Sequence, residues 1–312
     1  MDESAVFEIP GECDPDQVAT PLRHHPHAPR SRDSVRAPVS SYREFAPQHA
    51  MVAVLACTWE ARPGWPDQPT GKDTRTTAVL SPRMLPVLPD GCLDLTWDGR
   101  HLRAAAATAG PTRHPIDTPA DTVGLRLQPG WAAAVLGVPA HHLPPVLELS
   151  QLWSTPTVRQ LEERLSHAAT NPQRRDLLTE LTAHRLTKHH RVDRQVLAAI
   201  SHIARGHVSV HATAEAVGLS VRQLRRRFDE HVGLSPKTLH IILRFQHFLR
   251  AAQDPNQRRN LADIATTYGY SDQSHLTREC RRLANSTPRS LAIRAPQIES
   301  RTRDRPKSRT RP

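Results

Sequence analysis

The sequence predicts an α+β chain of more than one domain, in which a small β-rich N-terminal domain precedes an all-α C-terminal domain. Two observations predict this order. Short apolar runs separated by turn residues, typical of β-strands, occur between residues 41 and 127. From residue 192 onward, apolar residues recur at helical spacing, and Ser, Asn and Gly stand where helices begin and end. The 312 residues are enough for two domains of ordinary size.

Five segments follow from these patterns. Residues 1–40 are rich in Pro, His, Asp and Arg and lack apolar periodicity, which predicts a disordered arm. Residues 41–150 form the expected β-rich sensor or dimerisation domain, and residues 151–190 a helical linker. Residues 191–295 form the helical domain, and residues 296–312 a disordered basic tail. The arm contains His24, His25 and His27, but no ordered ligand set accompanies them, so we expect a solvated tract rather than a metal site.

Strands are predicted in residues 51–59, 84–87, 92–97 and 122–127. Pro89-Asp90-Gly91 is a strong turn signal before the third run, in which Leu93 and Leu95 lie on one face. Three prolines favour loops or edge strands between the later runs: Pro111, Pro115 and Pro119. Several short strands at this spacing predict a small β-sandwich or a barrel-like sensor domain.

Helical spacing replaces the strand pattern after residue 128. Residues 129–136 read as a short helix that ends at Gly137. Residues 157–168 and 172–187 carry apolar stripes. These two helices are expected to link the domains. Their stripes are compatible with a dimer contact and equally with packing on their own domain.

The positive charge of the chain is concentrated at one end. The net charge is +11, and the segment from Val192 to the C-terminus holds 22 Lys and Arg against 10 Asp and Glu. A basic domain beside a nearly neutral one is typical of a protein with a polyanionic partner. The alternative is a solvated basic surface that keeps the protein soluble.

The four cysteines argue against a zinc site or a disulfide framework, because no two of them form a Cys-x-x-Cys pair. They are Cys13, Cys57, Cys92 and Cys280. We therefore expect neither a metal nor a cofactor, and a reducing cytoplasm as the location. The acidic N-terminus is unlike a signal peptide, and the sequence has no stretch of about 18 apolar residues, so no membrane association is expected.

Two stretches of the C-terminal third share one design. Residues 208–228 and 260–280 each contain a short apolar helix with Ala, a Gly turn, a Ser cap and a second helix. Gly218 and Gly269 can adopt the positive φ of the tight turn, and Ser220 and Ser271 are the expected caps of the second helices. A repeat of the unit about 50 residues along the chain argues against coincidence. The pattern predicts two helix-turn-helix units.

The second helix of such a unit fits the major groove of DNA and presents its N-terminal residues to base edges. Arginine can bond to guanine O6 and N7, and glutamine suits adenine. The predicted base contacts are Arg222, Arg225, Arg226, Gln273, Ser274, Thr277 and Arg278. Three further arginines lie off these faces and are expected to contact phosphates: Arg227, Arg281 and Arg282. The alternative is that these arginines only form a solvated helix face. That alternative explains two such helices, both behind Gly turns and Ser caps, less well than it would explain one.

These motifs resemble the AraC/XylS DNA-binding domain over residues 192–294. The first unit matches through Ser220-x-Arg222-x-Leu224-x-Arg226-x-Phe228, Gly233 and Ser235-Pro236. The second unit matches through Ile264-Ala265, Gly269-Tyr270-Ser271, Ser274-His275, Arg278 and Thr287-Pro288. The resemblance implies that a long helix joins the units and that the two recognition helices enter successive major grooves.

Three positions depart from that pattern. Leu276 and Cys280 stand where the family usually has Phe, and Asn285 where it usually has Gly. Leu and Cys are smaller than Phe, so the core of the second unit is expected to be looser. Asn tolerates the left-handed backbone region, which makes position 285 a mild change.

The N-terminal half resembles an uncharacterised domain often found ahead of this DNA-binding module. The matching stretches are LPDGCLDLTW at 88–97, GLRLQPG at 124–130 and AAVLGVP at 133–139. The resemblance implies a sensing or dimerising role and names no ligand.

An enzyme and a nonspecific architectural DNA binder are the alternatives. Asp90 and Asp98 are explained by turns, and Asp94 falls in mid-strand. Cys57 and Cys92 lie in apolar runs that favour inert packing. The chain has no nucleophile elbow, phosphate loop or zinc helix motif. We therefore expect a sequence-specific transcription regulator that binds double-stranded DNA. A small-molecule effector, RNA polymerase and a second copy of the chain are candidate further partners.

Overall fold

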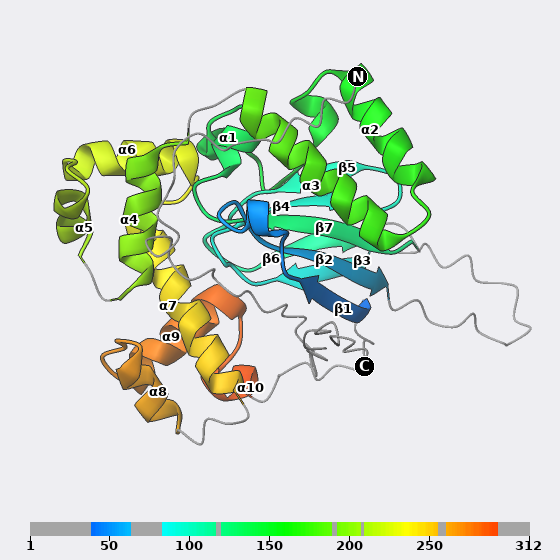
Figure 1. Cartoon of the computed structure of the whole chain (residues 1–312). Coiled ribbons are helices and arrows are strands. Elements are labelled where there is room, and N and C mark those ends of the chain that lie inside the picture. Colours follow the sequence, from blue (N-terminus) through cyan, green and yellow to red (C-terminus); the bar gives the residue numbers. More distant parts are fainter. Residues whose placement is uncertain are drawn as a thin grey trace, which may run out of the picture.

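The computed structural model describes residues 39–63, 83–116, 120–188, 192–206, 209–254 and 260–292. The predicted basic tail, the arm up to residue 38, the histidine cluster within it, Cys13 and Pro119 lie outside these residues. The described chain has the predicted α+β organisation, in which an antiparallel sheet and its helices precede an all-helical region (Figure 1).

Six strands form one antiparallel sheet in the order β1-β2-β7-β4-β5-β8. Their bounds are β1 Val39–Phe45, β2 Leu55–Pro63, β4 Leu93–Trp97, β5 Leu102–Ala105, β7 Thr122–Leu127 and β8 Val146–Glu148. Two further strands, β3 (Arg83–Val87) and β6 (Thr112–Ile116), pair only with each other. Pro115 lies in this small ribbon, where the missing N–H of proline is tolerated. The predicted strand at 122–127 is confirmed.

Two strand predictions require correction. The run at 51–59 begins as a 3-10 helix, η1 (His49–Met51), and a turn, and its strand starts only at Leu55. Met51 and Val54 are buried, so the apolar run indicated burial without specifying conformation. Within the described residues the larger sheet is open and has helices on one face, instead of closing into a sandwich or barrel. β5 was not predicted, because its sequence LRAA is short and rich in Ala.

Three helices belong to the N-terminal part: α1 (Ala132–Leu136), α2 (Thr155–His167) and α3 (Asn171–Lys188). α3 lies across β7 and β2, and Leu178 and Leu181 share one core with the sheet. Arg185 of α3 donates from Nε to the carbonyl of Val135 at 3.1 Å, which ties α3 to the end of α1. The expectation of a linker at 151–190 is thus corrected: the apolar stripes of α2 and α3 pack on their own sheet.

The other face of the sheet carries a buried charge cluster centred on Arg126. Its guanidinium binds Asp94 on the neighbouring strand through Nε to Oδ1 at 2.9 Å and Nη2 to Oδ2 at 3.1 Å. Asp90 lies 3.2 Å and Glu44 3.4 Å from the same guanidinium. Trp59 donates from its indole N–H to Asp94 at 3.3 Å. Three carboxylates therefore share one arginine.

Seven α-helices follow in the described residues of the C-terminal region. They are α4 Arg194–Ala204, α5 Val210–Ala216, α6 Val221–His231, α7 Pro236–Gln253, α8 Leu261–Thr267, α9 Gln273–Ala284 and α10 Pro288–Ala292. The long helix α7 runs between the α4–α6 group and the α8–α10 group (Figure 1). Its side chains Phe245, Phe248 and Leu249 are fully buried in a core that both groups share. None of the helices that the structure describes has the length and apolar character needed to cross a membrane.

Candidate nucleic-acid interface

The first pair of helices, α5 and α6, is joined by a tight turn at Gly218. The φ angle of Gly218 is 68°, a left-handed value that L side chains rarely adopt. Ser209 caps α5 by accepting from the N–H of Ala212. Ser220 caps α6 by accepting from the N–H of Gln223 at 3.2 Å, and the Gln223 side chain accepts from the N–H of Ser220 at 2.9 Å. This reciprocal capping box defines where α6 begins.

The faces of α6 are sharply different. Leu224 and Phe228 are fully buried against the helical core. Arg222, Arg225 and Arg226 are exposed on the opposite side. Because Arg225 and Arg226 follow Arg222 by three and four residues, the three side chains form one stripe on the N-terminal half of the helix. The arrangement leaves their guanidinium groups available to a partner.

Arg227 has partners within the protein. It is half-buried, and its Nη1 lies 3.0 Å from Oδ2 of Asp193 and 2.8 Å from Oε1 of Gln195. Asp193 is also the N-cap of α4. Arg227 therefore ties α6 to the start of α4, and its contact with DNA phosphate stays a prediction. Helical spacing placed it off the reading face but could not identify its distant partner.

The second pair, α8 and α9, has the same plan with a different cap. Gly269 turns the chain with φ at 72°, and Asn260 caps α8. The cap of α9 is Asp272, whose Oδ1 accepts from the N–H of His275 at 2.6 Å, so the prediction of Ser271 is wrong by one residue. Ser271 instead donates from its hydroxyl to Asp272 at 3.1 Å. The bond from the His275 N–H, followed by that from Ser271, lowers the pKa of the Asp272 carboxyl.

The outer side of α9 carries most of the polar residues predicted for it. Gln273, Ser274 and Arg278 are exposed, and so are Arg281 and Arg282 further along the helix. Thr277 is half-buried, and its hydroxyl donates to the carbonyl of Gln273 at 2.8 Å, so only its oxygen lone pairs are available to a partner. The inner side packs through fully buried residues, among them Leu276, Cys280 and Leu283.

Comparison with known proteins identifies this region. Residues 213–293 match a family described as a helix-turn-helix domain. The C-terminal region is an AraC-type helix-turn-helix domain. Domains of this type serve DNA-binding transcription regulators. Residues 43–145 match a domain of unknown function, DUF6597, which agrees with the resemblance seen in the N-terminal half.

Solved structures similar to the chain include two of ToxT from Vibrio cholerae. One, described as unsaturated fatty acid bound, is 9% identical with a TM-score of 0.39, and the match covers 68% of this chain and 92% of that one. The other, in the P21 form, is 8% identical with a TM-score of 0.38 and coverages of 68% and 95%. No curated protein matches the chain by sequence.

Two of the three positions where the AraC-type domain departs from the family pattern lie in its core, and the third ends α9. Leu276 and Cys280 are fully buried, and burial raises the pKa of the Cys280 thiol to about 12. Asn285 ends α9 with φ 49° and ψ 32°, the left-handed conformation expected for it. It is the one non-glycine residue with positive φ in the described part of the chain.

Sequence reasoning missed a polar network that holds the second pair together. Arg244 of α7 donates from Nη2 to Oε1 of Glu279 at 2.6 Å and from Nη1 to the carbonyl of Gly269 at 3.2 Å. Its guanidinium also lies 4.6 Å from the ring centre of Tyr270. Glu279 is buried on α9, which is unusual for a carboxylate unless it is paired. The signal available in the sequence was a charged residue on the apolar side of α9.

The residues weighed for catalysis have structural partners. Asp90 accepts from the N–H of Cys92 at 2.8 Å and Asp98 from the N–H of Arg100 at 2.9 Å, as their turns predict. Burial raises the pKa of the Cys57 and Cys92 thiols well above the ordinary value, so neither ionises readily. Among the described residues, no three His, Cys, Asp or Glu side chains are grouped to hold a metal ion.

Proposed function

We propose that this protein is a sequence-specific transcription regulator in which α6 and α9 read successive major grooves on one side of the DNA. The observation that carries the proposal is the pairing of two capped helices, each behind a glycine turn and each with a different exposed polar set. Two different sets favour reading of a defined sequence over uniform attraction to phosphate.

Each exposed side chain has a role that follows from its chemistry. Arginine at 222, 225 and 226 would bond to guanine in the first half-site. Gln273 would pair with adenine, and Arg278 with guanine, in the second half-site. Ser274 would accept or donate a single bond there, and the hydroxyl oxygen of Thr277 would accept one. Arg281 and Arg282 lie nearer the C-terminal end of α9 and would contact phosphates.

The N-terminal domain is assigned the role of modulating DNA binding. It packs directly against the AraC-type domain: Leu88, from the loop after β3, is buried in the helical core. His141, in the 3-10 helix η2 (Ala140–His142), lies 3.1 Å from the carbonyl of Asp229 at the end of α6. A domain in contact with a recognition helix can change how that helix is presented.

Selection of sites from a random DNA pool with the full chain tests the proposal. We expect an enriched site of about 15–20 base pairs, because two helices in successive grooves span about one and a half to two turns. At fixed salt, Arg222→Ala and Arg278→Ala should each weaken binding by roughly 1–3 kcal/mol and relax different base positions.

Arg159→Ala is the matched control. Arg159 is exposed on α2, so its removal lowers the charge equally without touching a recognition helix. An enriched site of half the expected length would show that one pair alone reads bases. No enriched sequence at all would refute sequence-specific regulation and favour an architectural DNA binder.

A further inference from the structure

A loop of the N-terminal domain, residues 88–91, packs against the middle of α7. The side-chain amide of Gln246 donates from Nε2 to the carbonyl of Pro89 at 2.7 Å, and both partners are buried. Leu88 is part of the same core as α7. The backbone at Gly91 approaches α7 so closely that a Cβ there would lie 2.6 Å from Cδ1 of Leu239. The loop therefore has little freedom to slide along the helix.

The loop is equally restrained from the other side. Oδ1 of Asp90 accepts from the N–H of Cys92 at 2.8 Å, which closes the turn. Oδ2 of Asp90 lies 3.2 Å from Nε of Arg126 in the centre of the sheet. Arg126 is buried and also bound to Asp94. A continuous set of short contacts thus connects β7 and β4 to Gln246.

The N-terminal domain also contacts both pairs of helices. At α6, the His141 ring lies 3.1 Å from the carbonyl of Asp229, and a Cβ at Gly233 would lie 3.1 Å from the carbonyl oxygen of Ala140. At α9, a Cβ at Gly110 would lie 3.9 Å from the carbonyl oxygen of Arg282. Loops and the helix η2 of the N-terminal domain therefore lie against the helix that joins the pairs and against one recognition helix on each side of it.

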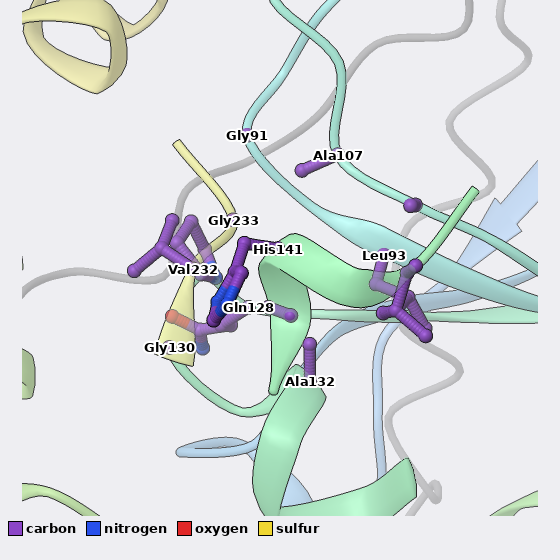
Figure 2. A pocket seen from close by; sticks show the side chains of 13 residues that line it. Gly91, Leu93, Ala107, Gln128, Gly130, Ala132, His141, Val232 and Gly233 are labelled. Atoms are coloured by element: carbon purple, nitrogen blue, oxygen red, sulfur yellow. The ribbon is translucent and has the colours of Figure 1, made fainter. Parts of the chain in front are cut away.

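The interface between the two regions is not packed throughout. A cavity of about 110 Å³ lies beside the loop and is lined by Gly91 and Gly130 of the N-terminal region and by Val232 and Gly233 of the C-terminal region (Figure 2). His141 and Gln128 also face it. Beside this cavity, the bond between Gln246 and Pro89 is a direct hydrogen bond from α7 to the loop.

We propose that loop 88–91 is a specificity-determining contact that sets the spacing between the two DNA half-sites by holding α7, and with it both recognition helices, at one orientation. This inference rests on the proposed function. Inserting one base pair between half-sites rotates the second by about 35° and moves it by about 3.4 Å. A protein held rigidly cannot follow that change, whereas one released at the loop can pivot about α7 and retain both sets of base contacts.

Full-length Gln246→Leu tests the proposal, because leucine retains the volume of the side chain and removes the donor. Dissociation constants are measured by fluorescence anisotropy on the selected site and on sites with one base pair added or removed between the half-sites. The wild type should lose about tenfold or more in affinity on the altered spacers, and Gln246→Leu about threefold or less, since an unmade buried hydrogen bond changes an equilibrium by about one order of magnitude.

Gln253→Leu is the matched control. Gln253 lies on the same helix and donates the same kind of bond, at 3.1 Å, to the carbonyl of Leu291 in α10, within the C-terminal region. This variant should keep the spacer discrimination of the wild type. Full discrimination in a folded Gln246→Leu protein, or equal loss in both variants, would overturn the proposal.

Asp90→Asn provides an independent route if Gln246→Leu fails to fold. Asparagine retains the oxygen that closes the turn and removes the charge that pairs with Arg126. It should also relax spacer discrimination, and the double variant should be no more relaxed than Gln246→Leu alone, since both changes act on one contact. Additive effects would refute a shared contact. A chain that enriches no site fails the proposed function itself, which is a separate outcome.

Discussion

Replacing Glu44 with Gln tests the buried charge cluster that anchors loop 88–91. Glu44 lies on β1, and its side chain is 18% exposed. It is the most distant of the three carboxylates around Arg126, which already makes two bonds to Asp94. Burial raises the pKa of Glu44 from 4.5 to about 7, although Arg126 and the hydroxyl of Tyr42 act in the opposite direction. Glutamine has the same shape, stays neutral and can still accept from Tyr42.

The sign of the effect follows from where the proton is held. Below pH 4.5 the carboxyl is protonated in both the folded and the unfolded chain. Between pH 4.5 and about 7 the folded protein keeps a proton that the unfolded chain releases, so the free energy of unfolding falls as the pH rises through this window. The stability present below pH 4.5 is therefore lost by the time the pH has passed the folded pKa. With 1.36 kcal/mol per pKa unit, the loss between pH 5 and pH 8 amounts to about 2.5 kcal/mol.

Urea unfolding of the wild type and Glu44→Gln at pH 5 and pH 8 measures this directly. The free energy of unfolding of the wild type, relative to that of the variant, should fall by about 2.5 kcal/mol between the two pH values. Other titrating groups cancel in the comparison. An equal difference at both pH values would refute the reasoning, because the carboxyl would then titrate alike in both states. A difference that grew in favour of the wild type would mean that attraction to Arg126 outweighs burial.

Three further predictions concern the AraC-type domain. Asp272→Ala should lower the midpoint of thermal unfolding, measured by fluorimetry, because Asp272 supplies the cap of α9. Ser271→Ala should leave that midpoint almost unchanged. The opposite ranking of the two variants would show that Ser271 is the cap. Asn285→Ala should lower the free energy of unfolding in urea by about 1 kcal/mol, because alanine is strained at positive φ, whereas Asn285→Gly should not lower it. Equal losses in the two variants would rule out a backbone cause. Replacing Arg281 and Arg282 together with Ala should reduce the slope of log Kd against the logarithm of the salt concentration by about 2, since each phosphate contact contributes about 0.9. The base preference should stay intact. An unchanged slope would exclude phosphate contacts by these two residues.

Local patterns in the sequence were sufficient wherever one turn of chain decides the structure. Gly218, Gly269 and Ser220 have the predicted conformations and bonds because their partners lie within a few residues. The same reasoning failed at Ser271, where two neighbouring residues can both cap a helix. The path of the backbone out of the buried Tyr270 decides between them, and it places Asp272 opposite the N–H of His275. Capping chemistry alone could not decide between the two residues.

Burial patterns were informative about which residues pack but not about what they pack against. The stripes of α2 and α3 were compatible with a dimer contact, and they cover the sheet of their own domain instead. The run at 51–59 was correctly predicted to be buried and wrongly predicted to be strand throughout. The free energy of transfer from water is similar for an apolar side chain against any apolar surface. Periodicity therefore cannot predict which surface the side chain packs against.

By itself, the sequence determined the class of this protein: a β-rich domain, a basic helical region, and two helix pairs whose caps, turns and exposed side chains are set by neighbours in the chain. Only the tertiary structure decided how these parts act on one another. It turned Arg227 toward Asp193, placed Arg244 between Glu279 and Gly269, and seated loop 88–91 on Gln246. Each of these bonds joins residues far apart in the chain. Their formation depends on the packing of whole elements, which no local preference encodes.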